Sequence, residues 1–471
     1  MQFTERSRLV LLLKKYLTRS ASDMTSGPII PQLLAFAIPM AIGMLFQQLY
    51  NTVDTMVVGK FVGSNALAAV GCNGNIINVV VGVFAGLATG AGVVISQAYG
   101  AHDDDRLSKA VHTTMALSLV MCVVGTLLGF VLARPLLDLT NTPEEVYSDA
   151  LTYLMIYFGG LTGLMIYNMG TGILRAVGDS TRPVIFLIIS ALVNTALDLL
   201  FVIVFDLGVA GVAWATIIAE FLSAVLTWIS LVRADGAYRV EVRKLAIDRP
   251  VLKEILRLGL PSAIQSGITS FSNVFVQGYI NDFGADCMAG WASYNKLDGF
   301  VVLPIQALSM GATTFVGQCW GAEKKKRANE GVRVSVLMSL GISVLLTVIV
   351  LVFSKGLMGW FIKEEDVGAM EYGLYFVRII TPFYLCIIFN QIYAGALRGI
   401  GIANAPTVIM LASFVAFRQI YLYFCTRFFP GERLVIALAY PVGWVMCSSL
   451  LAVCYFRSAL FRARKLPESI D

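Results

Sequence analysis

The sequence predicts an all-α, polytopic membrane protein with twelve transmembrane helices in two homologous six-helix lobes. Three observations support this fold class. Hydrophobic residues make up 57% of the chain and charged residues only 14%, whereas soluble domains carry about 25% charged residues. Apolar runs such as 33–58 and 110–132 reach the ~20 residues that a helix needs to cross the hydrocarbon core. Several blocks of the first half also recur in the second half at a nearly constant offset.

The apolar runs favour helices over the strands of a membrane barrel. They are rich in Gly, Ala, Leu and Val without strict alternation, whereas barrel strands are ~10-residue segments of alternating hydrophobicity. The start of the chain does not resemble a cleavable signal peptide, because the apolar stretch Leu9–Leu13 is short and is followed by Lys14 and Lys15. The expected spans are 32–58, 67–98, 107–133, 146–171, 182–205, 209–232, 253–282, 287–319, 328–354, 367–396, 404–427 and 434–457.

Basic residues set the orientation of these spans. An even number of spans places both termini on one side of the membrane, and the positive-inside rule assigns that side to the cytoplasm. The expected parts are a cytoplasmic segment 1–28, an N-lobe 29–232, a cytoplasmic linker 233–252, a C-lobe 253–457 and a cytoplasmic tail 458–471. The basic residues expected in the opposite loops are only Lys60, Arg134, Lys355, Lys363, Arg427 and Arg433.

The two halves are a repeat of parallel topology. Three blocks of the first half recur 221 to 223 residues later, and chance matches would not hold one offset over five spans. Duplicated halves suit transport by alternating access, and a duplicated scaffold without transport would leave the polar residues of the spans unexplained. The paired blocks are Ile38–Ile42 with Leu260–Ile264, Ser96–Ala101 with Gly317–Ala322, and Gly172–Gly178 with Gly395–Gly401.

Two carboxylates inside the spans are the main candidate functional residues. A carboxylate at mid-membrane costs ~2.5–3.5 kcal/mol on insertion scales, so it usually marks a pathway or has a specific partner. Gln47, Asn51 and Asp54 fall at i, i+4 and i+7 and therefore share one helical face. Asn194 and Asp198 share a face of the fifth span. We predict functional roles for Asp54 and Asp198, and the alternative is a structural hydrogen bond to a neighbouring helix.

Other polar or kinking residues give further candidates. Thr216 and Glu220 share a face of the sixth span, where Glu220 is either a third acid or a local ion-pair partner. Asn168 in the fourth span is a weaker candidate. Pro39 and Pro261 each remove a hydrogen bond within a span, which predicts either a gating hinge or a static kink. The GxxxG spacing of Gly82, Gly86 and Gly90 indicates close helix packing.

The repeat symmetry is broken at the carboxylates. Asp54 aligns with Val276, and Asp198 aligns with Tyr421, so the second half lacks both acids. We therefore expect a coupling cation to bind in the N-lobe only. The second half instead carries Lys296, Asp298, Arg378 and Arg418 within spans, and one acid cannot neutralise three bases. We expect the excess positive charge to contact an anionic group of the substrate, unless the side chains of Arg378 and Arg418 extend to water. The expected substrate-cavity residues are Gln47, Asn51, Asn273, Gln277, Lys296, Asp298 and Arg418.

These motifs together resemble the multidrug and toxic compound extrusion (MATE) family over residues 28–457. The resemblance implies two six-helix lobes around a central, V-shaped cavity in the bacterial inner membrane. It also implies export of small organic compounds in exchange for H⁺ or Na⁺. The matching segments are Pro39 with Gln47–Asp54, Val58–Gly59, Ala68–Gly71, the repeated Ser96–Ala101 block, and Leu174–Asp179.

Within that family the chain resembles the DinF-like branch most. That branch has an acid in the first span and an Asn/Asp pair in the fifth, matched here by Asp54, Asn194 and Asp198. The resemblance also implies that a Thr in the sixth span, here Thr216, lines the same cation site. Another branch places carboxylates in spans seven and ten. Here span ten has no mid-span acid, so that branch's cation site cannot be transferred.

The expected protein is a transporter and not an enzyme, with no cofactor beyond the coupling ion. The sequence shows no P-loop, no GxGxxG motif before a helix and no Cys/His metal cluster. We expect small organic substrates, a lipid bilayer, no nucleic-acid partner and a monomer. A lipid-linked saccharide flippase of related two-lobe fold is the alternative function. A membrane aspartyl hydrolase is disfavoured because Asp198 lacks a Gly-x-Gly-Asp context. The choice between H⁺ and Na⁺ stays open.

Overall fold

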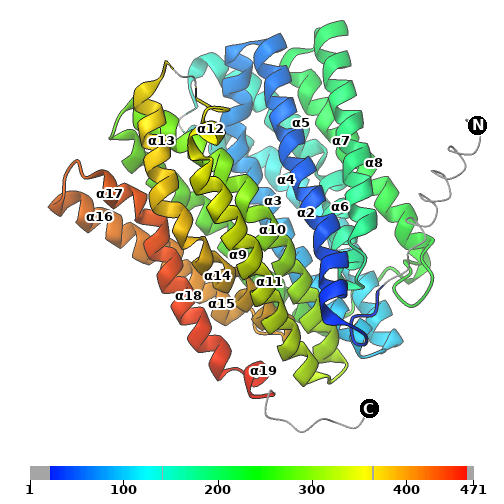
Figure 1. The fold of residues 1–471 in the computed structure, drawn as a ribbon. Helices are drawn as coiled ribbons and strands as arrows, with labels where there is room; N and C mark the ends of the chain where they lie inside the picture. The colour runs from blue at the N-terminus through cyan, green and yellow to red at the C-terminus, as the bar shows by residue number, and fades with distance from the viewer. Residues whose placement is uncertain (1–21, 141, 363–364, 464–471) are drawn as a thin grey trace, which may run out of the picture. The chain divides into compact units, whose positions relative to one another are not determined.

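The structure is a computed structural model that describes residues 22–140, 142–362 and 365–463. Throughout these ranges the chain forms helices and connecting segments without a β-strand (Figure 1). The prediction of an all-α membrane protein is therefore confirmed. The greater part of the predicted cytoplasmic segment 1–28 and about half of the predicted tail 458–471 lie outside the described residues.

The helices of the first half follow the predicted spans closely. A π-helical turn continues two of them, η1 after α2 and η2 after α7. The elements are α2 (Ile29–Val57), η1 (Val58–Val62), α3 (Ser64–Gly100), α4 (Asp104–Leu139), α5 (Glu144–Gly159), α6 (Leu161–Ala176), α7 (Thr181–Leu199), η2 (Leu200–Val204) and α8 (Gly208–Val232).

The second half begins after a short 3₁₀ turn in the linker, η3 (Val242–Lys244). Its long helices are α9 (Arg249–Asn281), α10 (Ala285–Gly321) and α11 (Lys325–Val352). The remaining elements are α12 (Ser354–Met358), α13 (Val367–Ile380), η4 (Thr381–Phe383), α14 (Tyr384–Gly399), α15 (Asn404–Leu411), η5 (Ala412–Phe417), α16 (Arg418–Phe428), α17 (Arg433–Ala437), α18 (Ala439–Arg457) and α19 (Ala459–Arg462).

The membrane-spanning character of the helices agrees with their sequence. Within the described ranges, ten helices are long and apolar enough to cross a membrane, and α5 with α6, bent by 50°, makes an eleventh. The predicted seventh span corresponds to α9, which at 33 residues is long enough to cross. Its first turns carry Lys253, Glu254 and Arg257, and polar residues continue along it, so its composition is less apolar than that of the others.

The backbone repeats the pattern that the sequence shows. The break between α5 and α6 falls at Gly160, and its counterpart in the second half is η4, whose Pro382 lies 222 residues later. Positive φ angles recur at offsets of 221 or 223 residues. The pairs are Gly63 with Gly284, His102 with Glu323, Gly178 with Gly401, and Gly208 with Gly431. Gly178 and Gly401 have nearly equal φ values of 86° and 87°, in the left-handed region that favours glycine after a helix end.

The chain divides into two compact units, and the division cuts two helices. The first unit contains residues 42–263 and the segment up to Met24, and the second contains 25–41 and 264–471. The first part of α2 therefore belongs to the second unit, and the first part of α9 belongs to the first unit. The predicted lobes 29–232 and 253–457 instead divide the chain between helices. Each cut falls two residues after a proline, Pro39 or Pro261, although both helices continue through the proline.

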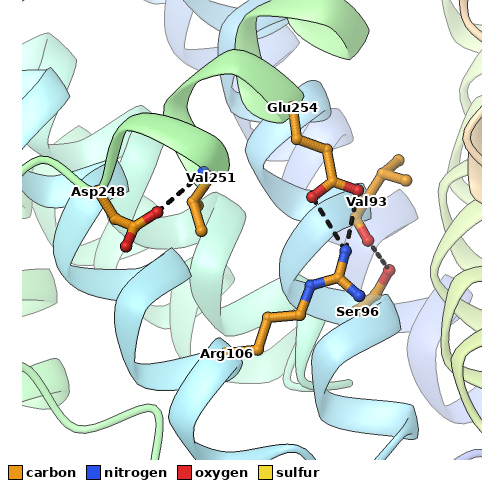
Figure 2. A network of polar contacts seen from close by, with 6 residues as sticks. All are labelled: Val93, Ser96, Arg106, Asp248, Val251 and Glu254. Carbon is orange, nitrogen blue, oxygen red and sulfur yellow. Dashed lines mark hydrogen bonds and ion pairs between the residues drawn. The ribbon is translucent and has the colours of Figure 1, made fainter.

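The linker is fixed to α4 within the first unit. The backbone N–H of Glu241 donates to Nε2 of His112 over 3.0 Å, and that of Asp248 donates to the Thr113 hydroxyl over 3.0 Å. Asp248 in turn accepts from the N–H of Val251 and so caps α9 (Figure 2). Arg106 donates to both carboxylate oxygens of Glu254 at 2.9 Å (Figure 2). These contacts hold the start of α9 in the first unit.

Helices α3 and α9 pack backbone to backbone in this unit. A Cβ atom at Gly86 would lie 2.8 Å from the carbonyl carbon of Ser262, and one at Gly90 would lie 2.7 Å from the carbonyl oxygen of Ile255. Both distances are shorter than real Cβ contacts, so only glycine permits this approach. The GxxxG spacing therefore reflects close helix packing, as the sequence predicts.

Candidate functional site

The first unit contains a polar cavity of about 270 Å³. Its lining comes from α2, α3, α5, α6, α7 and α8, so it depends on the tertiary fold of this unit. The cavity brings together most of the residues predicted from the first half. Its polar lining residues are Gln47, Asn51, Asp54, Asn78, Asn168, Ser190, Asn194, Thr216, Glu220 and Ser223, together with Tyr50, Tyr153, Tyr157 and Tyr167.

Asp54 and Asp198 face each other next to this cavity. Asp198 is 1% exposed, and its carboxyl group interacts electrostatically with that of Asp54. Two ionised carboxylates cannot donate to each other, and within the described ranges Oδ1 of Asp54 and both side-chain oxygens of Asp198 have no hydrogen-bond partner. A shared proton or a bound cation would remove the repulsion and satisfy these oxygens. The pair therefore has the chemistry of a cation site.

Helix α7 supplies a polar stripe that leads to Asp198. Ser190, Asn194 and Asp198 follow at intervals of four residues, so they lie on one helical face. All three are buried, and in the part of the chain that the structure describes neither the amide oxygen and nitrogen of Asn194 nor the Ser190 hydroxyl has a hydrogen-bond partner. Directly after Asp198 the helix widens into the π-helical turn η2, an irregularity often found at functional sites. The amide oxygen of Asn194 is a further suitable cation ligand.

The tyrosines of the cavity were not predicted from the sequence. The ring of Tyr153 stacks on that of Tyr157 with centroids 6.4 Å apart. The Tyr167 hydroxyl donates to the carbonyl oxygen of Pro183 over 3.3 Å. The i, i+4 spacing of Tyr153 and Tyr157 was a usable signal, because the same spacing indicated Asn194 and Asp198. Tyr50 and Tyr167 give no comparable pattern.

Glu220 and Asn168 line the same cavity as Asp54. Asn168 donates to the carbonyl oxygen of Leu164 over 2.8 Å, which leaves its side-chain oxygen available. Among the residues that the structure describes, no basic side chain interacts electrostatically with Glu220, so Glu220 is not a local ion-pair partner there. Within the same described ranges, no group of three or more His, Cys, Asp or Glu side chains could hold a metal ion.

In the second unit Arg418 is held by neutral partners. It is 3% exposed and donates at 2.8 Å to the Ser272 hydroxyl and at 2.8 Å to the Asn273 side-chain oxygen. Its guanidinium group also lies 4.7 Å from the centre of the Tyr440 ring. Arg418 is therefore buried in the unit and does not extend to water, which was the alternative expected from the sequence.

The other charged candidates of the second unit are separate from each other. Asp298 accepts from the Tyr294 hydroxyl over 3.1 Å, and the hydroxyls of Tyr294 and Tyr384 lie 3.3 Å apart. Lys296 is exposed, with Nζ 6.0 Å from the centre of the Phe361 ring. Gln277 donates to Asn281 over 2.9 Å. The structure therefore joins Asn273 to Arg418 but leaves Lys296 and Gln277 outside that cluster.

Comparisons with known proteins agree on one family. The family model MatE matches residues 39–200 and 261–424, one match in each half of the chain. The probable multidrug resistance protein YoeA of Bacillus subtilis is 27% identical over 93% of this chain and 95% of its own length. The probable multidrug resistance protein YpnP of the same organism is 28% identical over 95% of this chain and 99% of its own length.

Solved structures show the same fold. A multidrug resistance MATE family transporter in an outward-facing conformation matches with a TM-score of 0.88 at 21% sequence identity. The match covers 95% of this chain and 99% of that transporter.

Proposed function

The chain belongs to the MatE family, and we propose that it is a secondary active transporter that exports small organic compounds from a bacterial cell in exchange for H⁺ or Na⁺. The names of YoeA and YpnP support multidrug export. The observation that carries the proposal is the facing pair Asp54 and Asp198 beside a polar cavity in the membrane. A pair of acids whose buried carboxylate oxygens have no hydrogen-bond partner among the described residues is costly in a membrane unless it takes up a cation.

We propose that the cation site consists of Asp54, Asp198, Asn194, Asn168 and Thr216, as in the DinF-like branch. Binding of H⁺ or Na⁺ would remove the repulsion between the two acids and favour one conformation of the first unit. A cation acts on transport only through this difference in affinity between conformations. Pro39 and Pro261 are proposed hinges for alternating access, since the division between the two units falls two residues after each of them.

Reconstituted transport tests this function directly. Full-length protein in liposomes should accumulate ethidium when the lumen is acidic or Na⁺-loaded, because outward cation flow then drives the dye inward. Each gradient is imposed alone, which also identifies the coupling ion. An ethidium uptake rate that is the same with and without each gradient would contradict antiport. Movement of a lipid-linked saccharide without any dye transport would favour the flippase function instead.

We also propose that the second unit contributes to substrate binding through Gln277, Asn273, Lys296, Asp298 and Arg418, while Gln47 and Asn51 contribute from the first-unit cavity. The charges of Arg418 and Asp298 already meet protein groups. Among the described residues of this set, Lys296 is an exposed cation whose charge is available to an anionic substrate group.

Replacing Lys296 by Met keeps the side-chain length and removes this charge. Transport of a zwitterionic fluorophore should fall roughly tenfold, as expected for loss of a charged hydrogen bond of ~1.5 kcal/mol. Ethidium should still be exported at the wild-type rate. Lys355→Met removes another exposed lysine and serves as the control. Equal losses for both compounds, or no loss for either, would show that Lys296 does not contact substrate.

A further inference from the structure

The second unit contains a second cavity, of about 210 Å³, at the ends of α11, α14, α18 and α19. Most of its wall is aromatic. Tyr393 stacks on Tyr455 with ring centroids 4.5 Å apart, and Phe461 meets Phe456 edge to face at 4.9 Å. One face of α11 completes the wall, with Val332 and Val336 among its apolar residues. The cavity is distinct from the polar cavity of the first unit and has no part in the proposed cation site.

Hydrogen bonds preform this cavity. The side chain of Asn329, which is 7% exposed, donates to the Tyr455 hydroxyl over 2.9 Å and to the carbonyl oxygen of Leu460 over 3.2 Å. Ser458 caps α19 by accepting from the N–H of Phe461 over 3.3 Å. These contacts fix α19 against α11 and α18. The cavity therefore exists without a ligand, and its aromatic wall does not have to rearrange when a ligand binds.

A basic rim borders the aromatic wall. Arg333 is the charged residue that lines the cavity, and its side chain is exposed. Arg457 and Arg462 are exposed at the end of α18 and in α19, each next in sequence to a lining phenylalanine, and Arg462 donates to the carbonyl oxygen of Arg457 over 2.9 Å. The exposed Glu330 lies one turn from Arg333, but no described acid lies within ion-pair distance of Arg333. Among the described residues, the rim therefore carries more positive than negative charge.

We propose that this cavity binds an anionic phospholipid of the cytoplasmic leaflet. Its phosphate would lie at Arg333 and one acyl chain along the wall of Tyr393, Tyr455 and Phe461. The distribution of basic residues along the sequence places these helix ends at the cytoplasmic surface. Basic pockets between helices on that side suit anionic headgroups, and the negative leaflet attracts them. A free anion would use the arginine but not the apolar wall.

Native mass spectrometry of the full-length protein tests the proposal with dioleoylphosphatidylglycerol and dioleoylphosphatidylcholine as probes. The wild type should retain the anionic lipid in preference to the zwitterionic one. Arg333→Gln should weaken binding of the anionic lipid roughly fivefold, as expected for loss of one arginine near the headgroup. Val336→Trp keeps the charge but fills the cavity, and it should also displace the lipid. Arg233→Gln removes an exposed arginine at the end of α8 in the first unit and should leave binding unchanged.

Competition with inorganic phosphate separates a lipid site from a simple anion site. Phosphate at millimolar concentration should not displace the anionic lipid, because it gains nothing from the aromatic wall. Full displacement by phosphate would overturn the proposal. Equal binding of both lipids, or unchanged binding in both Arg333→Gln and Val336→Trp, would overturn it as well.

Discussion

Replacing Asp198 by Asn is expected to abolish gradient-driven export of ethidium from proteoliposomes while leaving the protein folded. Asn keeps the shape of the side chain but cannot take up the charge of H⁺ or Na⁺. The substitution also removes the repulsion from Asp54 that the cation relieves. We expect transport to fall by at least about tenfold, which corresponds to ~1.4 kcal/mol or more of lost coupling. Asp54→Asn should have the same effect.

Exchange transport separates loss of coupling from loss of substrate binding. With ethidium on both sides and no cation gradient, both variants should still exchange labelled for unlabelled dye. Neither variant should melt below the wild type, because each removes one of two facing negative charges. Gradient-driven export at the wild-type rate in either variant would contradict the cation-site assignment. A large fall in melting temperature would show instead that the pair is a structural contact.

Replacing Gly90 by Val is expected to disrupt the first unit. The new Cβ would overlap the backbone of Gly259 and lie 2.7 Å from the carbonyl oxygen of Ile255. Overpacking usually costs ~1–3 kcal/mol, and we expect about 3 kcal/mol or more here because the obstacle is backbone that cannot rotate away. The yield of monodisperse protein and its melting temperature should both fall sharply. Transport should fall with them.

Gly74→Ala is the matched control on the same helix. A Cβ at Gly74 would meet nothing within 4 Å, so this change should leave folding intact. Ala also has the better helix propensity, by about 1 kcal/mol. Equal stability of Gly90→Val and Gly74→Ala would mean that α3 and α9 do not approach as closely as described.

The membrane helices could be predicted from the sequence because length and hydropathy depend on neighbouring residues only. Even α9 was predicted despite Lys253, Glu254 and Arg257, since the repeat pairs its Pro261 with Pro39. The break at Gly160 was not predicted, because the apolar pattern of α5 runs on into α6. The π-helical turns were not predicted either. Each adds one residue to a helical turn, and no motif in the local sequence distinguishes it from an α-helical turn.

The assignment of α2 and α9 to two units could not be predicted. Hydropathy shows that each helix is continuous, but the residues that each half packs against are far away in the sequence. The hydrogen bonds that join Arg106 to Glu254 and Thr113 to Asp248 place the start of α9 in the first unit. Nothing in the local sequence of α9 indicates those partners.

The acids of the candidate site were predicted because a charge within an apolar span is conspicuous. Asp54 and Asp198 lie on different helices, and only the fold shows that their carboxyl groups face each other. The tyrosines around them were missed because an aromatic residue in a span is usually explained by packing or by the membrane interface. The charge of Lys296 is equally conspicuous in the sequence, but the fold does not bring it together with the other predicted charges. Its side chain is exposed beside Phe361.

The most direct test of the account measures cation release when substrate binds to the purified protein. The central claim is that the coupling cation binds in the first unit only. Adding ethidium to the wild type in weak buffer should release H⁺ or, in its place, Na⁺. Glu371→Gln, which changes an acid of the second unit outside the proposed substrate set, should release the same amount. Asp198→Asn should release none. Release by Asp198→Asn, or its loss in Glu371→Gln, would contradict the claim.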